Sequence, residues 1–388
     1  MKVLHVSKFY PPYKGGMETI LGDLCAGTAG DWDVAVVVAN ERPTNERGRQ
    51  DGVDVTRVAA YGTAASVPLC PLLPWRLWTA AADCVVLHEP NPIAGIALWM
   101  RKPAPRLVVW HHSDLVRPWW AAPTYGRIQR ALYRRADCVI VSSPALVRHS
   151  ALVQCARRIA VIPFGVPVDR YRRCDPDQRA RIERIRQRFP GPLLLFVGRL
   201  VYYKGIHVLI AAADRWPGSV AIVGEGPLES ELRAEVARRG LQERVVFAGR
   251  VSDEELPAYY QSCDALVLPS IARTEAFGVV QIEAMAAGRP VVSTNLPTGV
   301  PWVNRDGVTG LVVAPGNAEA LGAALARLGS DTALRARLGE GARLRAESTF
   351  TRERMVQSFR TVIETVVRSP ERLAALPRPA DVQADAAT

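Results

Sequence analysis

Short apolar segments alternate with longer segments of helical period along most of the chain. Runs rich in Val, Ile and Leu have the length and composition of buried strands. In the first half they fall at residues 2–7, 33–39, 84–88, 106–110, 138–143 and 159–163. Segments such as 16–27 and 123–136 have a helical pattern and lie between these runs. Strands that alternate with helices indicate an α/β fold with a parallel, doubly wound sheet.

The alternation stops at residues 164–192, which are polar, basic and bounded by prolines, as in a linker that contains a charged helix. It resumes with apolar runs at 193–198, 220–224, 244–249, 265–270 and 290–294. We therefore predict two Rossmann-like domains in tandem. Their expected bounds are 1–168 and 191–350, with a linker at 169–190, a last amphipathic helix at 351–368 and a disordered tail at 369–388.

Charge and cysteine content narrow the possible partners and the compartment. The 388 residues carry a formal charge of +11, and the first 190 residues hold all of the excess. A basic half suits an anionic partner, which can be nucleic acid, an acidic membrane surface or a phosphorylated substrate, although a solvated basic surface gives the same composition. Seven scattered cysteines without a CxxC pair favour a reducing compartment. We expect no signal peptide and no transmembrane helix.

Ligands of open parallel sheets bind beyond the carboxyl ends of the strands, so the loops that follow the apolar runs hold the candidate chemistry. The first such loop, "KFYPPYKGGMET", ends in Gly15 and Gly16 before a helix. Paired glycines allow a ligand to approach the backbone, and helix N-termini attract anions. A tight turn without a ligand explains the same letters equally well.

Histidines follow another strand, in the loop "WHHSD" that contains His111 and His112. Histidine at a strand end can bind a substrate, act in catalysis or have a purely structural role. A metal site would need more ligands, and His88 is the only obvious companion. We favour contact with a substrate and expect no metal here.

The second half contains two glycine-bearing turns. "VGRLVYYKG" places Gly198, Arg199 and Lys204 between a strand and a helix, where two cations could hold a diphosphate without a metal; surface salt bridges are the alternative. "VGEGPLESEL" carries Gly224, Glu225 and Gly226 but has Glu229 in place of the last glycine of a dinucleotide fingerprint. No Walker A sequence occurs.

Two glutamates flank the start of a helix in "RTEAFGVVQIEAMAAG", which ends at Gly288. Glu275 lies in the loop, and Glu283 lies about 9 Å along the axis from Phe277. A nucleotide diphosphate across the helix mouth would meet free amides, with its sugar at Glu275 and its ribose near Glu283. The amides in question belong to Ala276, Phe277, Gly278 and Val279. The alternative is a local pair at Glu283 and a solvated Glu275.

Taken together, these segments resemble the retaining glycosyltransferases of family four, which have the GT-B fold of two Rossmann-like domains facing a cleft. The resemblance covers about residues 1–368. The segments that carry it are "FYPPYKGGMET", "WHHSD", "IPFGVPVDRY", "VGRLVYYKG", "VGEGPLESEL", "VVFAGRVSDEEL", "LPSIARTEAFGVVQIEAMAAGRPVV" and "GVTGLVVAPGN".

The resemblance implies a role for each candidate. The N-terminal domain, completed by helix 351–368, would bind the acceptor, and the C-terminal domain would bind the nucleotide-sugar. Arg199 and Lys204 would grip the diphosphate, and Glu275 and Glu283 would contact sugar and ribose. Gly15 and Gly16 would approach the phosphate and sugar. His112 would be the active-site histidine, or His111 if the match to the family is shifted by one residue. The sites implied for the nucleotide-sugar also include Gly198, Gly224, Glu225 and Gly226.

The implied reaction is retaining transfer of a hexose from a nucleoside-diphosphate sugar to a lipid-linked saccharide, with no cofactor and no metal. "NLPTGVPWVNRDGVTGLVV", "WHHSDLVRPWW" and "HEPNPIAG" are similar to bacterial O-antigen mannosyl- and rhamnosyltransferases, which suggests GDP-mannose as the donor in lipopolysaccharide biosynthesis. Two D-x-D sequences, at 31–33 and 175–177, lie away from strand carboxyl ends, and we expect no metal there.

Residues 114–136 interleave Trp119, Trp120 and Tyr125 with arginines, which suits an anionic membrane surface at the cytoplasmic face of the plasma membrane; a partly buried helix with a solvated basic face is the alternative. Three other functions are weighed. A nucleic-acid-binding protein would follow from charge alone, and we expect no nucleic-acid partner, because the second half is neutral. A GT-B-like epimerase or a non-catalytic nucleotide-sugar binder would share the site.

Overall fold

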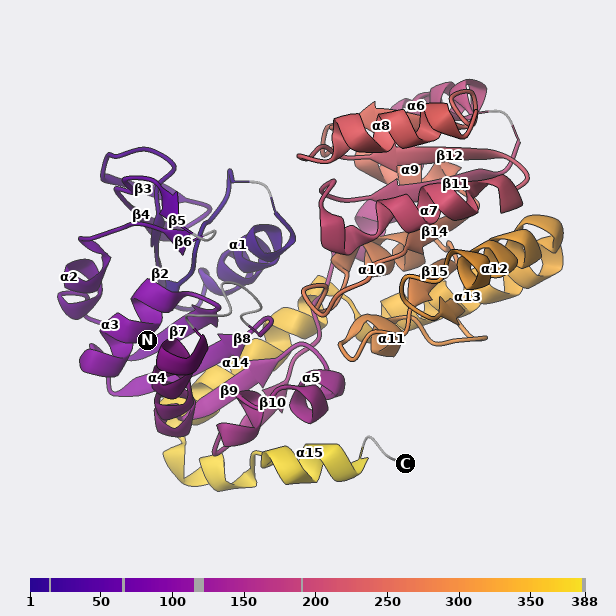
Figure 1. Ribbon diagram of the computed structural model, residues 1–388. Coiled ribbons are helices and arrows are strands. Elements are labelled where there is room, and N and C mark those ends of the chain that lie inside the picture. Colours follow the sequence, from indigo (N-terminus) through magenta and orange to yellow (C-terminus); the bar gives the residue numbers. More distant parts are fainter. Residues whose placement is uncertain (14, 65–66, 115–121, 190, 386–388) are drawn as a thin grey trace. The chain divides into compact units, whose positions relative to one another are not determined.

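The computed structural model describes residues 1–13, 15–64, 67–114, 122–189 and 191–385. The chain divides into two compact units, which are described separately (Figure 1). The first unit contains Met1–Phe164 and Arg352–Thr388, and the second contains Gly165–Thr351. Basic and acidic residues number 25 and 17 in the first unit and 24 and 21 in the second, so most of the positive excess lies in the first.

An eight-stranded sheet forms the centre of the first unit, in the order β10-β9-β8-β7-β1-β2-β4-β3. All neighbours are parallel except β3, which pairs antiparallel with β4 at the edge. The strands are β1 Lys2–Val6, β2 Asp33–Ala39, β3 Glu46–Gln50, β4 Val53–Val58, β7 Cys84–Glu89, β8 Arg106–His111, β9 Cys138–Val141 and β10 Ile159–Val161. A separate two-stranded pair joins β5 Thr63–Ala64 to β6 Val67–Pro68.

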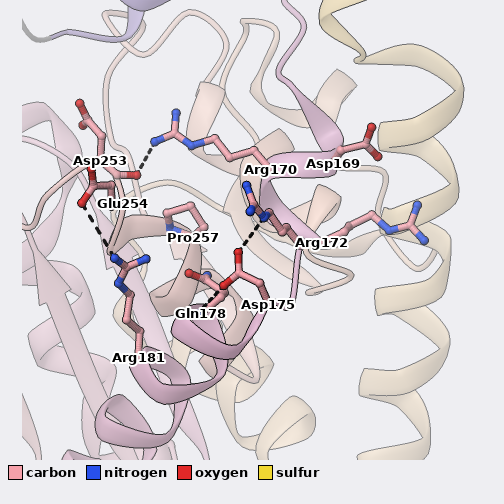
Figure 2. Close-up of a pocket in the computed structure, with 10 residues that line it drawn as sticks. Asp169, Arg170, Arg172, Asp175, Gln178, Arg181, Asp253, Glu254 and Pro257 are labelled. Carbon is pink, nitrogen blue, oxygen red and sulfur yellow. Dashed lines mark hydrogen bonds and ion pairs between the residues drawn. The ribbon is translucent and has the colours of Figure 1, made fainter.

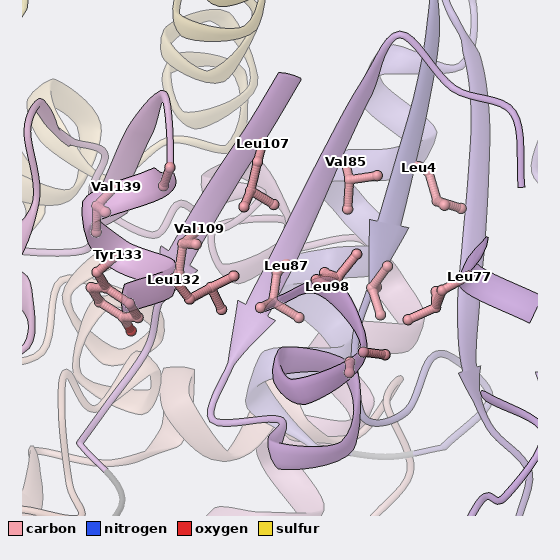
Figure 3. Close-up of a cluster of buried hydrophobic side chains, with 14 of the residues drawn as sticks. Leu4, Leu77, Val85, Leu87, Leu98, Leu107, Val109, Leu132, Tyr133 and Val139 are labelled. Carbon is pink, nitrogen blue, oxygen red and sulfur yellow. The ribbon is translucent and has the colours of Figure 1, made fainter. Parts of the chain in front are cut away.

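Helices cover both faces of this sheet, which explains why its central strands are nearly continuous apolar runs. Leu4, Val85 and Val109 point from one face and pack against Leu98 and Leu132 of the helices (Figure 3). On the opposite face, α14 lies beside α1, and its Phe359 stacks on Trp110 of β8. The helices are α1 Gly16–Thr28, α2 Leu73–Trp78, α3 Pro92–Met100, α4 Ala122–Arg135, α5 Pro144–His149, η2 Val153–Cys155, α14 Arg352–Arg368, η6 Pro370–Ala375 and α15 Pro379–Asp385.

The second unit has a six-stranded, wholly parallel sheet in the order β13-β12-β11-β14-β15-β16. The change of direction in strand order falls between β11 and β14, which is where ligands of such sheets bind. The strands are β11 Leu193–Val197, β12 Ser219–Val223, β13 Val245–Gly249, β14 Ala265–Leu268, β15 Val291–Thr294 and β16 Gly310–Val313.

The helices of the second unit supply a core in which Leu209, Trp216 and Leu325 are buried against the strands. They are η3 Val168–Tyr171, α6 Pro176–Arg188, η4 Tyr202–Lys204, α7 Ile206–Ala212, η5 Ala213–Arg215, α8 Glu229–Arg238, α9 Leu256–Ser262, α10 Val279–Ala286, α11 Val300–Val303, α12 Ala318–Ser330 and α13 Thr332–Thr349. The two apolar-run series of the sequence therefore correspond to two parallel sheets, as predicted.

The segment expected as a linker, 169–190, is instead a packed part of the second unit through residue 189. Gln178 of α6 is buried and donates to the side-chain oxygen of Gln261 at 2.9 Å, while Ile185 and Phe189 are buried beside it. The Gln261 amide nitrogen donates to the carbonyl oxygen of Tyr171 at 2.8 Å. A buried amide, Gln178, takes a position where a core helix usually has an apolar residue, so the segment has little apolar pattern.

The tail expected to be disordered also has structure as far as residue 385. It forms η6 and α15 in the first unit, and Val382 of α15 is buried. The backbone nitrogen of Ile159 donates to the carbonyl oxygen of Pro377 at 2.9 Å, so the tail lies along the outer edge strand β10. An unpaired edge gives this proline-rich segment a hydrogen-bond partner that its composition does not reveal.

Candidate functional site

A buried ion pair lies at the carboxyl edge of the second sheet. Lys204 ends η4 after β11, and Glu275 lies in the loop after the neighbouring strand β14. The Lys204 Nζ is 2.5 Å from Glu275 Oε2, and the two side chains are only 12% and 10% exposed. The buried Ser270 hydroxyl also donates to Glu275 Oε2, at 3.2 Å. The structure thus brings together two candidate residues that were predicted from separate segments of the sequence.

The charge of Lys204 is retained in this setting. Burial lowers the pKa of Lys204, but the negative charge of Glu275 opposes this and leaves the pKa above its ordinary value. A buried ammonium is tolerated only when an opposite charge or hydrogen bonds compensate it. The Lys204 Nζ also lies 5.8 Å from the ring centre of Tyr203. Lys204 therefore presents a fixed positive charge close to the strand ends.

Arg199 lies in the same turn but is exposed. Burial raises the pKa of Tyr203, and the positive charges of Lys204 and Arg199 both act to lower it. The two cations therefore surround one tyrosine. This arrangement leaves Arg199 able to reach a ligand, while Lys204 is held in place by Glu275.

The glycines of the two turns bring their backbones into contact. Gly198 and Gly224 have φ values of 152° and 131°, which residues with a side chain rarely adopt. A Cβ on Gly224 would lie 2.0 Å from the carbonyl oxygen of Gly198, and one on Gly226 would lie 2.4 Å from that of Leu200. The carbonyl of the exposed Glu225 accepts from Leu200 N at 2.9 Å. Backbone packing between the turns accounts for Gly224 and Gly226 before any ligand is considered.

Helix α10 begins beside the ion pair without a side-chain cap. Gly278, its N-cap residue, has φ 73° and ψ 68°, and no side-chain cap hydrogen bond forms there. The preceding Ala276 carbonyl accepts from Gly299 N at 2.8 Å. The ring of Phe277 is buried near Trp302 and Phe350, so this residue can face a ligand only with its backbone. Uncapped amides at a helix start favour an anion.

Glu283 is bound by two tyrosines that the sequence did not nominate. Tyr171 of η3 donates to Glu283 Oε1 at 3.0 Å, and Tyr260 of α9 donates to Oε2 at 2.5 Å. Burial raises the pKa of Glu283, and the hydrogen bonds from Tyr260 and Tyr171 act to lower it. Each carboxylate oxygen keeps a further acceptor position, so a hydroxyl of a ligand can still be accommodated. Tyr171 ends the segment "IPFGVPVDRY" and Tyr260 lies in no quoted segment, and only the fold brings both hydroxyls to Glu283.

In the first unit, the glycine pair before α1 lies against an acid. Gly15 has an extended backbone with φ −172°, and a Cβ on it would lie 2.1 Å from Glu18 Oε2. Nothing lies within 4 Å of such an atom on Gly16. Burial raises the pKa of Glu18, and the charge of Lys8 acts to lower it. Glu18 is not among the residues predicted from the sequence, and its carboxyl group lies close to the Gly15 backbone.

The two adjacent histidines have different partners. His111 Nδ1 is 2.8 Å from the Tyr133 hydroxyl, and His111 Nε2 is 3.7 Å from Asp114 Oδ1. His112 Nε2 is 2.9 Å from His88 Nδ1. Burial lowers the pKa of His112 to about 3 and that of His111 to about 4, so both rings are neutral near pH 7. His112 therefore contacts the buried His88, whereas His111 contacts Tyr133 and Asp114.

A buried acid, Glu89, lies next to these histidines. Tyr125 donates to its Oε1 at 2.9 Å, and Gln129 donates to its Oε2 at 3.0 Å. Burial raises the pKa of Glu89, and these hydrogen bonds act to lower it. Tyr125 was expected among the aromatics of a membrane-facing segment, but it is buried against Glu89. Trp119, Trp120 and Arg117 of that segment lie outside the described residues.

A cavity of about 390 Å³ lies at the carboxyl ends of β1 and β2 in the first unit. The rings of Phe9 and Tyr13 stack in its wall with centres 4.1 Å apart. The remaining lining residues are mostly polar: Tyr10, Pro12, Ala39, Asn40, Glu41, Arg42, Glu46, Gln50 and Arg57. Stacked rings beside planar polar groups are a surface that can bind a saccharide.

A cavity in the second unit has balanced charge. It measures about 770 Å³ and lies between η3, α6 and the start of α9 (Figure 2). Its ten lining residues include four arginines and four acids. Arg173 pairs with Asp175 at 2.7 Å, and Arg181 lies 3.9 Å from Glu254. The charges of this cavity are matched within the protein, so it offers no preference for an anion.

Among the residues that the structure describes, no group of three or more His, Cys, Asp or Glu side chains is arranged to hold a metal ion. Within the same residues, none of the helices has the length and apolar character needed to cross a bilayer.

Known proteins resemble the chain over nearly its whole length. Residues 178–345 match the family described as glycosyl transferases group 1, and residues 15–165 match the glycosyl transferase 4-like domain. O-antigen chain mannosyltransferase C of Escherichia coli is 33% identical, covering 95% of this chain and 100% of that protein. D-rhamnosyltransferase WbpZ of Pseudomonas aeruginosa is 32% identical, covering 90% and 92%. Sucrose-phosphate synthase from Thermosynechococcus elongatus has a similar structure, with a TM-score of 0.78, 24% identity and coverage of 94% and 98%.

Proposed function

Because the chain belongs to the family-four type of glycosyltransferases, which have the GT-B fold, we propose that it transfers a hexose from a nucleoside-diphosphate sugar to a lipid-linked saccharide. The observation that carries this proposal is the buried pair of Lys204 and Glu275 beside the uncapped start of α10. A cation, a carboxylate and the amides of a helix N-terminus are groups that suit a sugar diphosphate.

The diphosphate of the donor binds at Lys204, Arg199 and the first amides of α10 in this proposal. Phosphate oxygens accept from cations and from helix N-terminal amides, and both sources are present at one strand edge. Lys204 has three N–H donors, so it can hold a phosphate oxygen while it stays bound to Glu275. Glu275 accepts hydrogen bonds from sugar hydroxyls, and Glu283 accepts from the ribose.

We propose a retaining reaction without a metal. The bond between the anomeric carbon and the phosphate oxygen breaks, and the acceptor oxygen bonds to that carbon on the same face. The acceptor proton passes to the departing phosphate. Negative charge grows on the phosphate in the transition state, and preorganised cations and amides stabilise it there more than in the ground state.

The acceptor binds in the first unit in this proposal. Its saccharide packs on the stacked rings of Phe9 and Tyr13, and its hydroxyls meet the polar lining of the neighbouring cavity. Aromatic faces provide apolar contact with sugar rings, and the planar side chains of Asn40, Arg42 and Arg57 provide directional hydrogen bonds.

The lipid part of the acceptor would be presented at an anionic membrane surface, at the cytoplasmic face of the plasma membrane. The described part of residues 114–136 supports this with exposed Arg127, Arg130 and Arg134 on α4. Helix α3 packs on α4 and adds Trp99 and Met100, which are 43% and 62% exposed. Basic and large apolar side chains on adjoining helices suit an acidic bilayer interface.

We propose mannose as the sugar and GDP-mannose as the donor, in the synthesis of O-antigen or a related surface polysaccharide. The support is the sequence resemblance and the names of the relatives, a mannosyltransferase and a D-rhamnosyltransferase.

The test supplies the purified chain with labelled GDP-mannose and a polyprenyl-diphosphate-linked saccharide, and follows both label transfer and GDP release. We expect acceptor-dependent transfer that Lys204→Ala and Glu275→Gln each reduce by roughly 10²–10³-fold. Arg239→Ala is the matched control, because Arg239 is an exposed arginine that pairs with Glu235 at the far end of α8.

The outcomes separate the alternatives. Sugar conversion without an acceptor would indicate an epimerase, and tight donor binding without GDP release would indicate a non-catalytic binder. Wild-type turnover by Lys204→Ala would remove the site proposed here.

A further inference from the structure

Three buried histidines form a continuous row of hydrogen bonds in the first unit. His5 lies in β1, His88 in β7, and His112 directly after β8. His5 Nδ1 is 3.1 Å from His88 Nε2, and His88 Nδ1 is 2.9 Å from His112 Nε2. We call these three residues the histidine row. It contains the proposed active-site histidine at one end and two residues without an assigned role.

Strand register explains why residues so distant in sequence meet. In the parallel sheet, His5 lies opposite Val86, and His88 lies opposite Trp110. Each next histidine is therefore two positions further along its strand than the partner of the one before. Side chains two positions apart point to the same face, so all three rings lie on one face along a diagonal. The diagonal runs from within β1 to the carboxyl edge of the sheet.

Aromatic rings enclose the row. Trp110 stacks on His88 and His112 with ring centres 5.7 Å and 5.8 Å apart. Phe164 stacks on His112 at 5.6 Å, and Phe359 of α14 lies 5.5 Å from His5. Burial lowers the pKa of His5 and of His112 to about 3 each, and it lowers the pKa of His88 well below the ordinary value. All three rings are therefore neutral under ordinary conditions.

A row of neutral imidazoles has a single direction of donation. Each ring carries one N–H and one bare nitrogen, so when one ring donates to the next, all of them donate in the same sense. Two nitrogens are left over: His5 Nε2 and His112 Nδ1 are buried and have no hydrogen-bond partner among the described residues. One of them must be an N–H, and the other must be a bare acceptor.

A ligand oxygen next to His112 favours one of the two directions of hydrogen-bond donation along the row. The nitrogen at the far end, His5 Nε2, then stays without a partner, and a buried orphan N–H is rarer than a buried orphan acceptor. The favoured state has a bare His5 Nε2 and an N–H at Nδ1 of every ring. His112 Nδ1 then donates outward. Free histidine in water prefers the opposite tautomer, so this state is a distinctive consequence of the row.

We propose that His5 and His88 are positioning residues that hold His112 in its Nδ1–H tautomer, so that it donates to an oxygen of the transferred sugar. This inference rests on the proposed function for its substrate. The tautomer is a property of the protein alone.

The test uses protein labelled with ¹⁵N only in its six histidines and measures long-range ¹H–¹⁵N correlations of the rings. We expect His5, His88 and His112 to show neutral Nδ1–H rings from pH 8 down to about 5, where an ordinary histidine is already charged. His149→Asn, at an exposed histidine, serves as the assignment control and should remove one signal only.

Two variants at His88 separate positioning from packing. His88→Phe keeps a ring of similar size and removes both hydrogen bonds, so we expect His112 to revert toward Nε2–H. His88→Asn places an amide N–H where His88 Nδ1 was, so it should restore donation to His112 Nε2 although the bond from His5 is lost. We expect kcat to fall roughly tenfold or more in His88→Phe with an unchanged KM for the donor, and to recover largely in His88→Asn.

Several results would overturn the proposal. An Nε2–H tautomer at His112 in the wild type is one, and an unchanged His112 tautomer in His88→Phe is another. Wild-type kcat in a His88→Phe protein whose tautomer has changed would make the row purely structural. If wild-type protein transfers no sugar, the proposed function fails, while the tautomer measurement still decides whether the row sets the state of His112.

Discussion

Both units bury polar groups near the carboxyl edge of their sheets, but these groups are neutral in the first unit and charged in the second. The first unit buries three neutral imidazoles against aromatic rings, and the second buries an ammonium against a carboxylate. Neutral groups need only a hydrogen-bond donor that faces an acceptor, whereas buried charges need a partner of opposite sign. The comparison teaches that the first unit is suited to orient hydroxyl groups and the second to receive a charged ligand.

Acid should weaken the first unit most. The folded pKa values of His5 and His112 lie near 3, below the unfolded value of about 6.5, so the unfolded chain binds more protons as the pH falls through this window. The stability is complete above pH 6.5 and is lost on acidification. Protonation of the two rings in the unfolded chain should lower the free energy of unfolding by about 4 kcal/mol at pH 5 relative to pH 8.

Urea unfolding followed by hydrogen exchange on peptides of each unit would measure this effect. His5→Phe removes one titrating ring and leaves Glu89 and Glu18 in place, so its first unit should lose stability with acid less steeply than the wild type. Equal slopes in the two proteins would show that His5 is not kept neutral by the fold.

Removal of one charge in the second unit should have the next largest effect. Lys204→Met leaves Glu275 buried without its cation, and such a change typically costs about 3–5 kcal/mol. The double variant Lys204→Met/Glu275→Leu should be less unstable than Lys204→Met, because no buried charge remains. A double-mutant cycle of unfolding free energies in the second unit measures the coupling. Additive effects would mean that the pair is not mutually dependent.

The backbone contact between the turns predicts a smaller loss. Gly224→Ala places a Cβ 2.0 Å from the Gly198 carbonyl oxygen at φ 131°, so the turn must shift. We expect about 2–3 kcal/mol of destabilisation in the second unit. Gly240→Ala is a matched control at φ 68°, where nothing lies within 4 Å of the added atom. Thermal unfolding of both variants should separate the cost of the clash from that of the positive φ.

Loss of the hydroxyl group of Tyr171 in η3 should have the smallest effect. Tyr171→Phe removes one hydrogen bond to Glu283 and leaves the other, which should cost about 1 kcal/mol of stability. If Glu283 binds the ribose, this variant should also weaken GDP binding measured by calorimetry. An unchanged affinity with the expected stability loss would limit Tyr171 to a structural role.

The periodic pattern of the sequence predicted the two sheets because buried parallel strands are continuous apolar runs. It missed β3, whose sequence ERGRQ is polar because the strand lies at an exposed edge. It also assigned 169–190 to a linker and 369–388 to a disordered tail, because buried glutamines and an edge-strand contact leave no apolar period.

The candidate residues were predictable one by one, but their partners were not. Lys204 and Glu275 meet because β11 and β14 are neighbours, and strand order cannot be read from a list of strands. His5 lies inside an apolar run and His88 drew notice only as a possible metal ligand, since their contact depends on register. Tyr171 and Glu18 lie inside segments that carry the family resemblance, but nothing in those letters indicates their partners, and Tyr260 lies in no such segment.

The return of the last segment to the first unit affects the order in which the protein can fold during synthesis. All strands of the first sheet leave the ribosome before the second unit, and Phe359, which covers His5, follows only after Thr351. The face that holds the histidines therefore stays uncovered while almost two hundred further residues are translated. A nascent chain stalled before residue 352 should expose that face to chaperones, and its release should occur when α14 emerges.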